Sequence, residues 1–137
     1  MTLEQKREHE RVKALFTELM DKPLQTFPPL RGELKAPDQR GVYVIYLPRG
    51  KKVLHVGRTP RAQGGIAQRL RDHMSGNSSF VIQYLDRDGS KLRGKYKFHC
   101  IVVDNPERRA FLEAYATGQL CPDHIGLGLG KWMQNNF

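Results

Sequence analysis

Five polar residues on three predicted elements are of types that bind phosphate or move a proton. One predicted strand carries Tyr43, and the next carries His55 and Arg58. A predicted helix carries Arg69 and His73, which are four residues apart and therefore share a helix face. An arginine binds anionic oxygens through two parallel hydrogen bonds, and a histidine accepts a proton from water near neutral pH. Together these types suit acid–base chemistry on an anionic substrate.

A carboxylate that suits a hard metal ion lies far downstream of this group. Glu113 falls in a predicted helix, near Ala110, Ala114 and Thr117. These small neighbours leave the carboxylate open on one side, and divalent cations such as Mg²⁺ prefer oxygen ligands. Each candidate also has an ordinary interpretation, such as a tyrosine that covers a sheet face or a solvated helix arginine. The functional interpretation therefore depends on the set and not on any single member.

Positive charge is concentrated around these candidates. The chain has 23 Lys and Arg against 14 Asp and Glu, a formal net charge of +9. No acidic residue occurs between Asp38 and Asp72, and the basic residues of that run are Arg40, Arg49, Lys51, Lys52, Arg58, Arg61, Arg69 and Arg71. A surface of one sign suits the phosphate backbone of a nucleic acid. Chance clustering in a basic chain is the alternative interpretation.

Length and composition limit the broad class of protein. The 137 residues suffice for one domain with its own core. Cys100 and Cys121 stand in no CxxC or Cys/His spacing, so we expect reduced thiols and no structural zinc site. The charged N-terminal segment lacks an apolar signal core, and no apolar run reaches about 18 residues. We therefore expect an intracellular protein with no membrane association.

The pattern along the chain predicts a mixed α and β fold. A capping box at Thr2 begins a helix that Pro23 ends, and residues 22–40 read as an extended connector. Apolar strands over 42–47 and 52–56 flank a turn, and helical spacing follows over 66–74. Residues 80–85 fit a helix or a strand equally well. A third strand is predicted over 95–103, and Asn105 caps a last helix that runs to about 120.

Four short motifs in this order resemble the GIY-YIG nuclease superfamily. They are "GVY" at 41–43, "HVG" at 55–57, "QRLRDHM" at 68–74 and "ERRAFLEAYATGQLCP" at 107–122. The resemblance covers residues 40–122, with the motifs on strand, strand, helix and helix. It implies an α+β domain with a small three-stranded antiparallel sheet flanked by helices. On this basis residues 1–35 form an extra N-terminal helix and a proline-rich connector, and 36–137 form the nuclease-like domain.

The resemblance also implies an activity and a role for each candidate. The family cleaves phosphodiester bonds with one divalent cation, Mg²⁺ or Mn²⁺, and the implied substrate is DNA, with RNA left open. Tyr43 matches the tyrosine that positions or deprotonates water, and His55 stands at the second motif tyrosine. Arg69 matches the arginine that stabilises the phosphate, and His73 matches a general base or water-orienting group. Glu113 matches the single metal ligand. The residues expected to bind the nucleic-acid backbone are Lys51, Lys52, Arg58, Arg61 and Arg71.

Two departures from the family pattern leave a second interpretation open. His55 replaces a tyrosine, and His124 or Ile125 falls near the place of a family asparagine. Either the site works with altered acid–base groups, or the chain is a nucleic-acid-binding module with little catalysis. No specificity domain is visible in the sequence. A minimal nuclease, a homodimer or a part of a larger complex are therefore all compatible with it.

Overall fold

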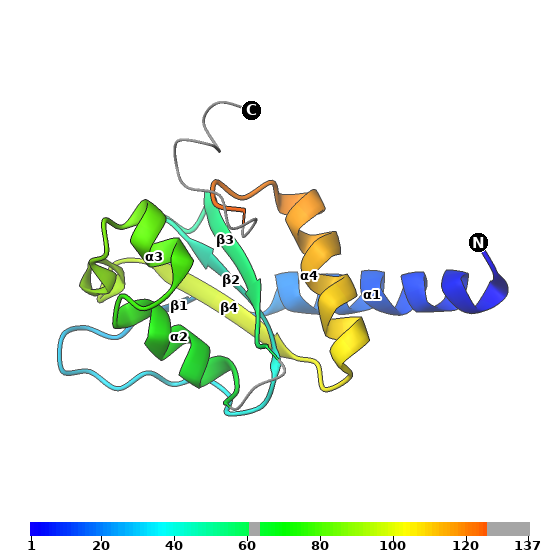
Figure 1. Ribbon diagram of the computed structural model, residues 1–137, viewed down its shortest axis with the longest axis horizontal. Helices are drawn as coiled ribbons and strands as arrows, with labels where there is room; N and C mark the ends of the chain where they lie inside the picture. Colours follow the sequence, from blue (N-terminus) through cyan, green and yellow to red (C-terminus); the bar gives the residue numbers. More distant parts are fainter. Residues whose placement is uncertain (61–63, 126–137) are drawn as a thin grey trace.

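An antiparallel sheet lies between two layers of helices in the computed structural model, which describes residues 1–60 and 64–125 (Figure 1). The strands are β1 (Gln25–Thr26), β2 (Gly41–Tyr46), β3 (Val53–Arg58) and β4 (Lys97–Val102). Their order across the sheet is β1-β4-β2-β3, so β2 is central and β3 is at an edge. The mixed α and β fold with a small antiparallel sheet is thus confirmed.

The two faces of the sheet belong to two separate hydrophobic clusters. Every residue of β2 is buried, as expected for a strand covered on both sides. Tyr43 and Ile45 point into one cluster, whereas Val42 and Val44 point into the other. The alternation of the strand therefore sends Tyr43 toward the layer that contains the helix of Arg69 and His73.

The helices α1 (Leu3–Asp21) and α4 (Pro106–Leu120) cover the face that carries Val42 and Val44 (Figure 1). The predicted capping box forms at α1, where Thr2 accepts from the backbone of Gln5 and the Gln5 side chain accepts from the backbone of Thr2. Asn105 caps α4 as predicted. None of the described helices is long and apolar enough to cross a membrane.

The opposite face is covered by α2 (Ile66–Met74), α3 (Ser79–Tyr84) and the 3₁₀ helix η1 (Gly89–Leu92). The bounds of α2 agree with the predicted helix. Residues 80–85, which fitted two structures, are mostly helical, because the Ser78 hydroxyl accepts the backbone N–H of Val81 and caps the turn.

The number of strands differs from the prediction. Residues 22–40 were expected to be an extended connector and the sheet to have three strands, yet β1, within that connector, adds a fourth strand of two residues. Gln25 pairs with Phe98, and the fully buried Phe27 ring lies 4.8 Å from the Phe98 ring, centroid to centroid. Burial of one aromatic side chain thus fastens the connector to the edge of β4.

Candidate functional site

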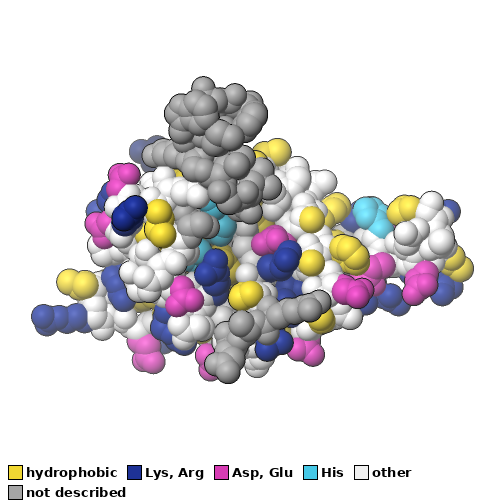
Figure 2. Space-filling model, viewed as in Figure 1, with side chains coloured by type: hydrophobic (Ala, Val, Ile, Leu, Met, Phe, Trp, Pro, Cys, Tyr) yellow, Lys and Arg dark blue, Asp and Glu magenta, His cyan; other side chains and the backbone are white. Residues whose placement is uncertain are grey.

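Four of the five predicted catalytic residues, and Arg58 of the predicted nucleic-acid-binding group, line one pocket at the edge formed by β3. The pocket has a volume of about 670 Å³ and lies between the helical layers. In the view of Figure 2, histidine side chains are visible near the centre of the molecule, close to Lys or Arg and Asp or Glu side chains. The lining residues are Tyr43, His55, Val56, Gly57, Arg58, Pro60, Arg69, Glu113, Ala114, Thr117, His124 and Ile125.

The glycines of the two strand motifs are required by close contacts. Gly57 lies directly opposite Tyr43 across the β2–β3 pair. A Cβ at Gly57 would lie 2.3 Å from the Tyr43 hydroxyl, and a Cβ at Gly41 would lie 2.0 Å from the carbonyl oxygen of Ile101. Both distances are far below van der Waals contact. The absence of a side chain at 57 therefore lets the Tyr43 phenol lie across β3.

The Tyr43 hydroxyl contacts a buried histidine, His73. The hydroxyl oxygen is 2.7 Å from Nε2 of His73, and Nδ1 of His73 is 2.5 Å from the hydroxyl of Ser78. Burial raises the pKa of Tyr43, an effect that the nearby Arg69 charge opposes in part. Burial lowers the pKa of His73 to about 3, and the Arg69 charge adds to this shift. Tyr43 is therefore a neutral phenol, and His73 is a neutral partner that does not line the pocket.

His55 lies beside both Tyr43 and His73, with ring centroids 5.9 and 5.4 Å away, and a second histidine, His124, holds it in place. The His55 ring stacks on Phe80 with 4.8 Å between centroids, and its Nδ1 is 2.9 Å from Nδ1 of His124. The other nitrogen of His124, Nε2, is 3.0 Å from the amide oxygen of Gln83. Burial, followed by the nearby His73, His124 and Arg69, lowers the pKa of His55 well below its usual value.

The opposite wall of the pocket carries Glu113, which is paired with an arginine. Nη1 of Arg58 donates to a carboxylate oxygen of Glu113 at 2.9 Å, and the Glu113 side chain is 28% exposed. Burial raises the pKa of Glu113, while Arg58 and then Arg69 oppose that rise. Ala114 and Thr117 line the pocket beside it, as expected from their small size. The pocket thus combines two arginines with one carboxylate.

The residues expected to bind a nucleic-acid backbone are placed unequally. Arg58 lines the pocket, whereas Lys51 and Arg71 are exposed outside its lining. Lys52 pairs with Asp123 at 3.2 Å, so part of its charge is compensated. Arg61 lies outside the described residues. Of the four members of this group that the structure describes, only Arg58 is therefore placed at the pocket itself.

Sequence reasoning missed three supporting residues. Ser78 bonds His73, Gln83 bonds His124, and His124 bonds His55. His124 had been noted only as standing near the place of a family asparagine. The backbone N–H of His124 donates to the carbonyl of Leu54, which aligns this segment with the edge of β3. No periodicity signals such a contact across 69 residues, although a histidine after a Pro–Asp pair marks a loop that can carry function.

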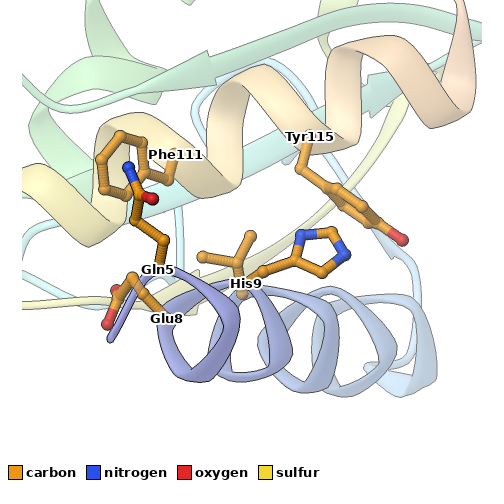
Figure 3. A pocket seen from close by; sticks show the side chains of 6 residues that line it. Gln5, Glu8, His9, Phe111 and Tyr115 are labelled. Carbon is orange, nitrogen blue, oxygen red and sulfur yellow. The ribbon is translucent and has the colours of Figure 1, made fainter. Parts of the chain in front are cut away.

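A second pocket lacks this concentration of chemical groups. It lies between α1 and α4, has a volume of about 250 Å³ and is lined mainly by apolar surface (Figure 3). The Glu8 carboxylate beside it is already engaged by Arg108, whose Nε donates at 2.7 Å. His9 and Tyr115 face each other there with ring centroids 6.1 Å apart. We interpret this pocket as a gap in the packing of α1 against α4.

Comparison of the chain with models of known protein families and with curated proteins finds no match. The site is therefore interpreted from its own geometry. Among the described residues, no group of three or more His, Cys, Asp or Glu is arranged around a common metal position. A single carboxylate still fits Mg²⁺, which keeps several waters and takes further ligands from substrate phosphates. Glu113 is the residue that fits this role.

The buried histidines predict that acid destabilises the fold. The pKa values of His55, His73 and His99 are all lowered mainly by burial. Below about pH 6.5 the unfolded chain therefore binds more protons than the folded one, and stability falls as the pH falls. His73 alone should cost about 2 kcal/mol of the free energy of unfolding between pH 6.5 and pH 5.

Urea unfolding at pH 7 and at pH 5 measures this effect. His73→Gln should reduce the difference between the two midpoints, and His9→Gln, at an exposed position of α1 beside Tyr115, should leave it unchanged. Equal midpoints for the wild-type protein at the two pH values would contradict the assignment of neutral buried histidines.

Proposed function

We propose that this chain is a metal-dependent endonuclease of the GIY-YIG type that hydrolyses phosphodiester bonds in DNA. The observation that supports this most is the common pocket of Tyr43, Arg69 and Glu113, which come from β2, α2 and α4. These elements are far apart in the sequence, and each supplies a different chemical type. In phosphodiester hydrolysis a phenol can orient water, a guanidinium can stabilise the charge on the phosphate, and a carboxylate can hold a divalent cation.

Arg69 is proposed to bind the scissile phosphate. Its side chain lines the pocket, and its Nε is buried without a hydrogen-bond partner among the described residues. A guanidinium donates two parallel hydrogen bonds to phosphate oxygens, and its charge offsets the charge that builds up there during attack. A substrate phosphate would therefore supply the partner that Nε of Arg69 lacks.

Tyr43 is proposed to orient the attacking water. Its oxygen can accept a hydrogen bond from water while its own proton is directed at Nε2 of His73, 2.7 Å away. As the water oxygen attacks phosphorus, the bond from phosphorus to the leaving sugar oxygen breaks, and that oxygen takes a proton from solvent. The proton of the attacking water moves to the phenol oxygen, and the phenol proton moves to His73. A bound phosphate favours this transfer, because its negative charge offsets the Arg69 charge that helps to lower the pKa of His73. His73 is then a positioning residue and proton acceptor that does not touch the substrate.

Glu113 is proposed to hold the divalent cation, Mg²⁺ or Mn²⁺. When bound, such a cation supplies a positive charge for the leaving oxygen and a set of coordinated waters. In this structure Arg58 forms an ion pair with the Glu113 carboxylate. It would exchange that partner for a substrate phosphate, which keeps the charge of the pocket balanced.

The experiment is cleavage of a supercoiled plasmid by the purified protein. We expect nicking with Mg²⁺ or Mn²⁺, none with EDTA, and a loss of about 10³-fold in rate for Glu113→Gln because the cation loses its carboxylate. Glu107→Gln, on the first turn of the same helix and outside this pocket, is the matched control. Equal nicking by Glu113→Gln and wild type would refute the assignment of Glu113.

A nucleic-acid-binding module with little catalysis is the second candidate function. The Arg58–Glu113 ion pair favours it, because it occupies the carboxylate that a cation would need. This candidate predicts DNA binding that weakens steeply with salt, falls for Arg58→Ala and leaves the DNA intact. Binding without cleavage by wild type in Mn²⁺ would select it over the endonuclease.

A further inference from the structure

His55, which stands at the second motif tyrosine, and His124, one of the two residues near the place of the family asparagine, are in direct contact. His55 and His124 are joined by their Nδ1 atoms at 2.9 Å, and their rings lie 4.9 Å apart, centroid to centroid. Both side chains are buried, with 6% of His55 and 1% of His124 exposed. The two histidines therefore form one structural unit at the edge of β3.

The hydrogen bonds of this unit determine where its protons lie. The amide oxygen of Gln83 can only accept, so Nε2 of His124 carries a hydrogen and donates it. In a neutral imidazole the other nitrogen is then a bare acceptor, so Nδ1 of His124 accepts from Nδ1 of His55. His55 consequently carries its hydrogen on Nδ1, and its Nε2 is a lone pair.

The structure leaves that lone pair without a partner. Nε2 of His55 is buried and has no hydrogen-bond partner among the described residues, although His55 lines the pocket. The groups around it are the rings of Tyr43, His73, Phe80 and His124 and the nearby charge of Arg69. An unpaired buried acceptor is costly, so a donor bound in the pocket that reaches this atom would stabilise the site.

We propose that His124 and Gln83 are positioning residues that hold His55 as the Nδ1–H tautomer, so that its Nε2 accepts a hydrogen from a ligand hydroxyl or ordered water in the pocket. The family tyrosine at this position presents a hydroxyl, which both donates and accepts. His55 held in this way presents an acceptor only. The inference rests on the proposed function for the reaction that it serves, but not for the tautomer itself.

Nitrogen-15 NMR of the histidine rings in the full chain tests this directly, without any substrate. Free histidine favours the Nε2–H tautomer, so an Nδ1–H signal for His55 at pH 7 requires the hydrogen-bond chain. We expect a bare Nε2 and a protonated Nδ1 for His55, and the same for Gln83→Glu, whose carboxylate can also only accept. An Nε2–H signal for wild-type His55 would overturn the proposal.

Two variants of His124 separate positioning from simple packing. His124→Ala should return His55 to the Nε2–H tautomer. His124→Asn should keep Nδ1–H, because its side-chain oxygen is as far along the side chain as Nδ1 of histidine.

In the plasmid assay we expect the cleavage rate to fall about 10- to 100-fold for His124→Ala and to recover for His124→Asn. Unchanged tautomer and unchanged rate in His124→Ala would overturn the proposal. A wild-type protein that has the Nδ1–H tautomer but never cuts DNA would instead refute the proposed function and leave the tautomer intact.

Discussion

Replacement of Arg69 by alanine is expected to lower the rate of metal-dependent DNA cleavage by about 10³-fold or more. Arg69 lines the pocket between Tyr43 and Glu113, and it influences the pKa of both groups. Its removal takes away the charge that we propose stabilises the phosphate in the transition state. Single-turnover cleavage with saturating protein measures the chemical step apart from binding.

The control for this prediction lies on the same helix. Arg71 is exposed and outside the pocket lining, and it donates to Gln68 at 3.4 Å, so Arg71→Ala removes one positive charge without changing the pocket. It should weaken DNA binding modestly and leave the single-turnover rate unchanged. Arg69→Lys keeps the charge but loses the planar fork, so it should remain far below wild type. If Arg69→Ala and Arg71→Ala lowered the single-turnover rate equally, Arg69 would contribute only general positive charge and no specific contact with the phosphate.

Replacement of Gly57 by alanine is expected to destabilise the fold by about 3 kcal/mol and to abolish cleavage. The new Cβ would lie 2.3 Å from the Tyr43 hydroxyl and 2.4 Å from its Cζ. The ring cannot retreat easily, because it is fully buried and its hydroxyl is bonded to His73. Urea unfolding measures the stability, and the plasmid assay measures the activity.

Gly118→Ala is the matched control, because it makes the same chemical change where there is space. Gly118 lies within α4, and a Cβ there would meet nothing within 4 Å. Alanine is favoured over glycine in a helix, so this variant should gain about 1 kcal/mol in the free energy of unfolding. If Gly57→Ala were as stable as wild type, the close approach of Tyr43 to β3 would be wrong.

Local signals predicted the parts of the fold that depend on neighbouring residues. The capping box at Thr2, the helix over 66–74 and the Asn105 cap were confirmed, because each rests on contacts within about one turn. The hydroxyl cap at Ser78 would have decided the ambiguity at 80–85 in favour of a helix. By contrast, β1 is only two residues long, and its partner Phe98 is more than 70 residues away, so no periodicity marks it.

The candidate site also has some features that neighbouring residues predict and others that depend on contacts distant in the sequence. The spacing of Arg69 and His73 placed both on α2, and strand alternation directed Tyr43 toward that helix. The sequence could not reveal that His73 faces Tyr43 and Ser78 and is absent from the pocket lining, because that depends on packing depth. Nor could it reveal that Arg58 and Glu113 are paired, since these residues are 55 positions apart.

A crystal of the protein grown with Mn²⁺ and a short DNA duplex tests the central claim most directly. Anomalous scattering locates Mn²⁺ independently of any assumption about the site. We predict one Mn²⁺ bound to the Glu113 carboxylate, with Arg58 released from that carboxylate and a DNA phosphate contacting Arg69. Bound DNA with Arg58 and Glu113 still paired and no Mn²⁺ in this pocket would contradict the account.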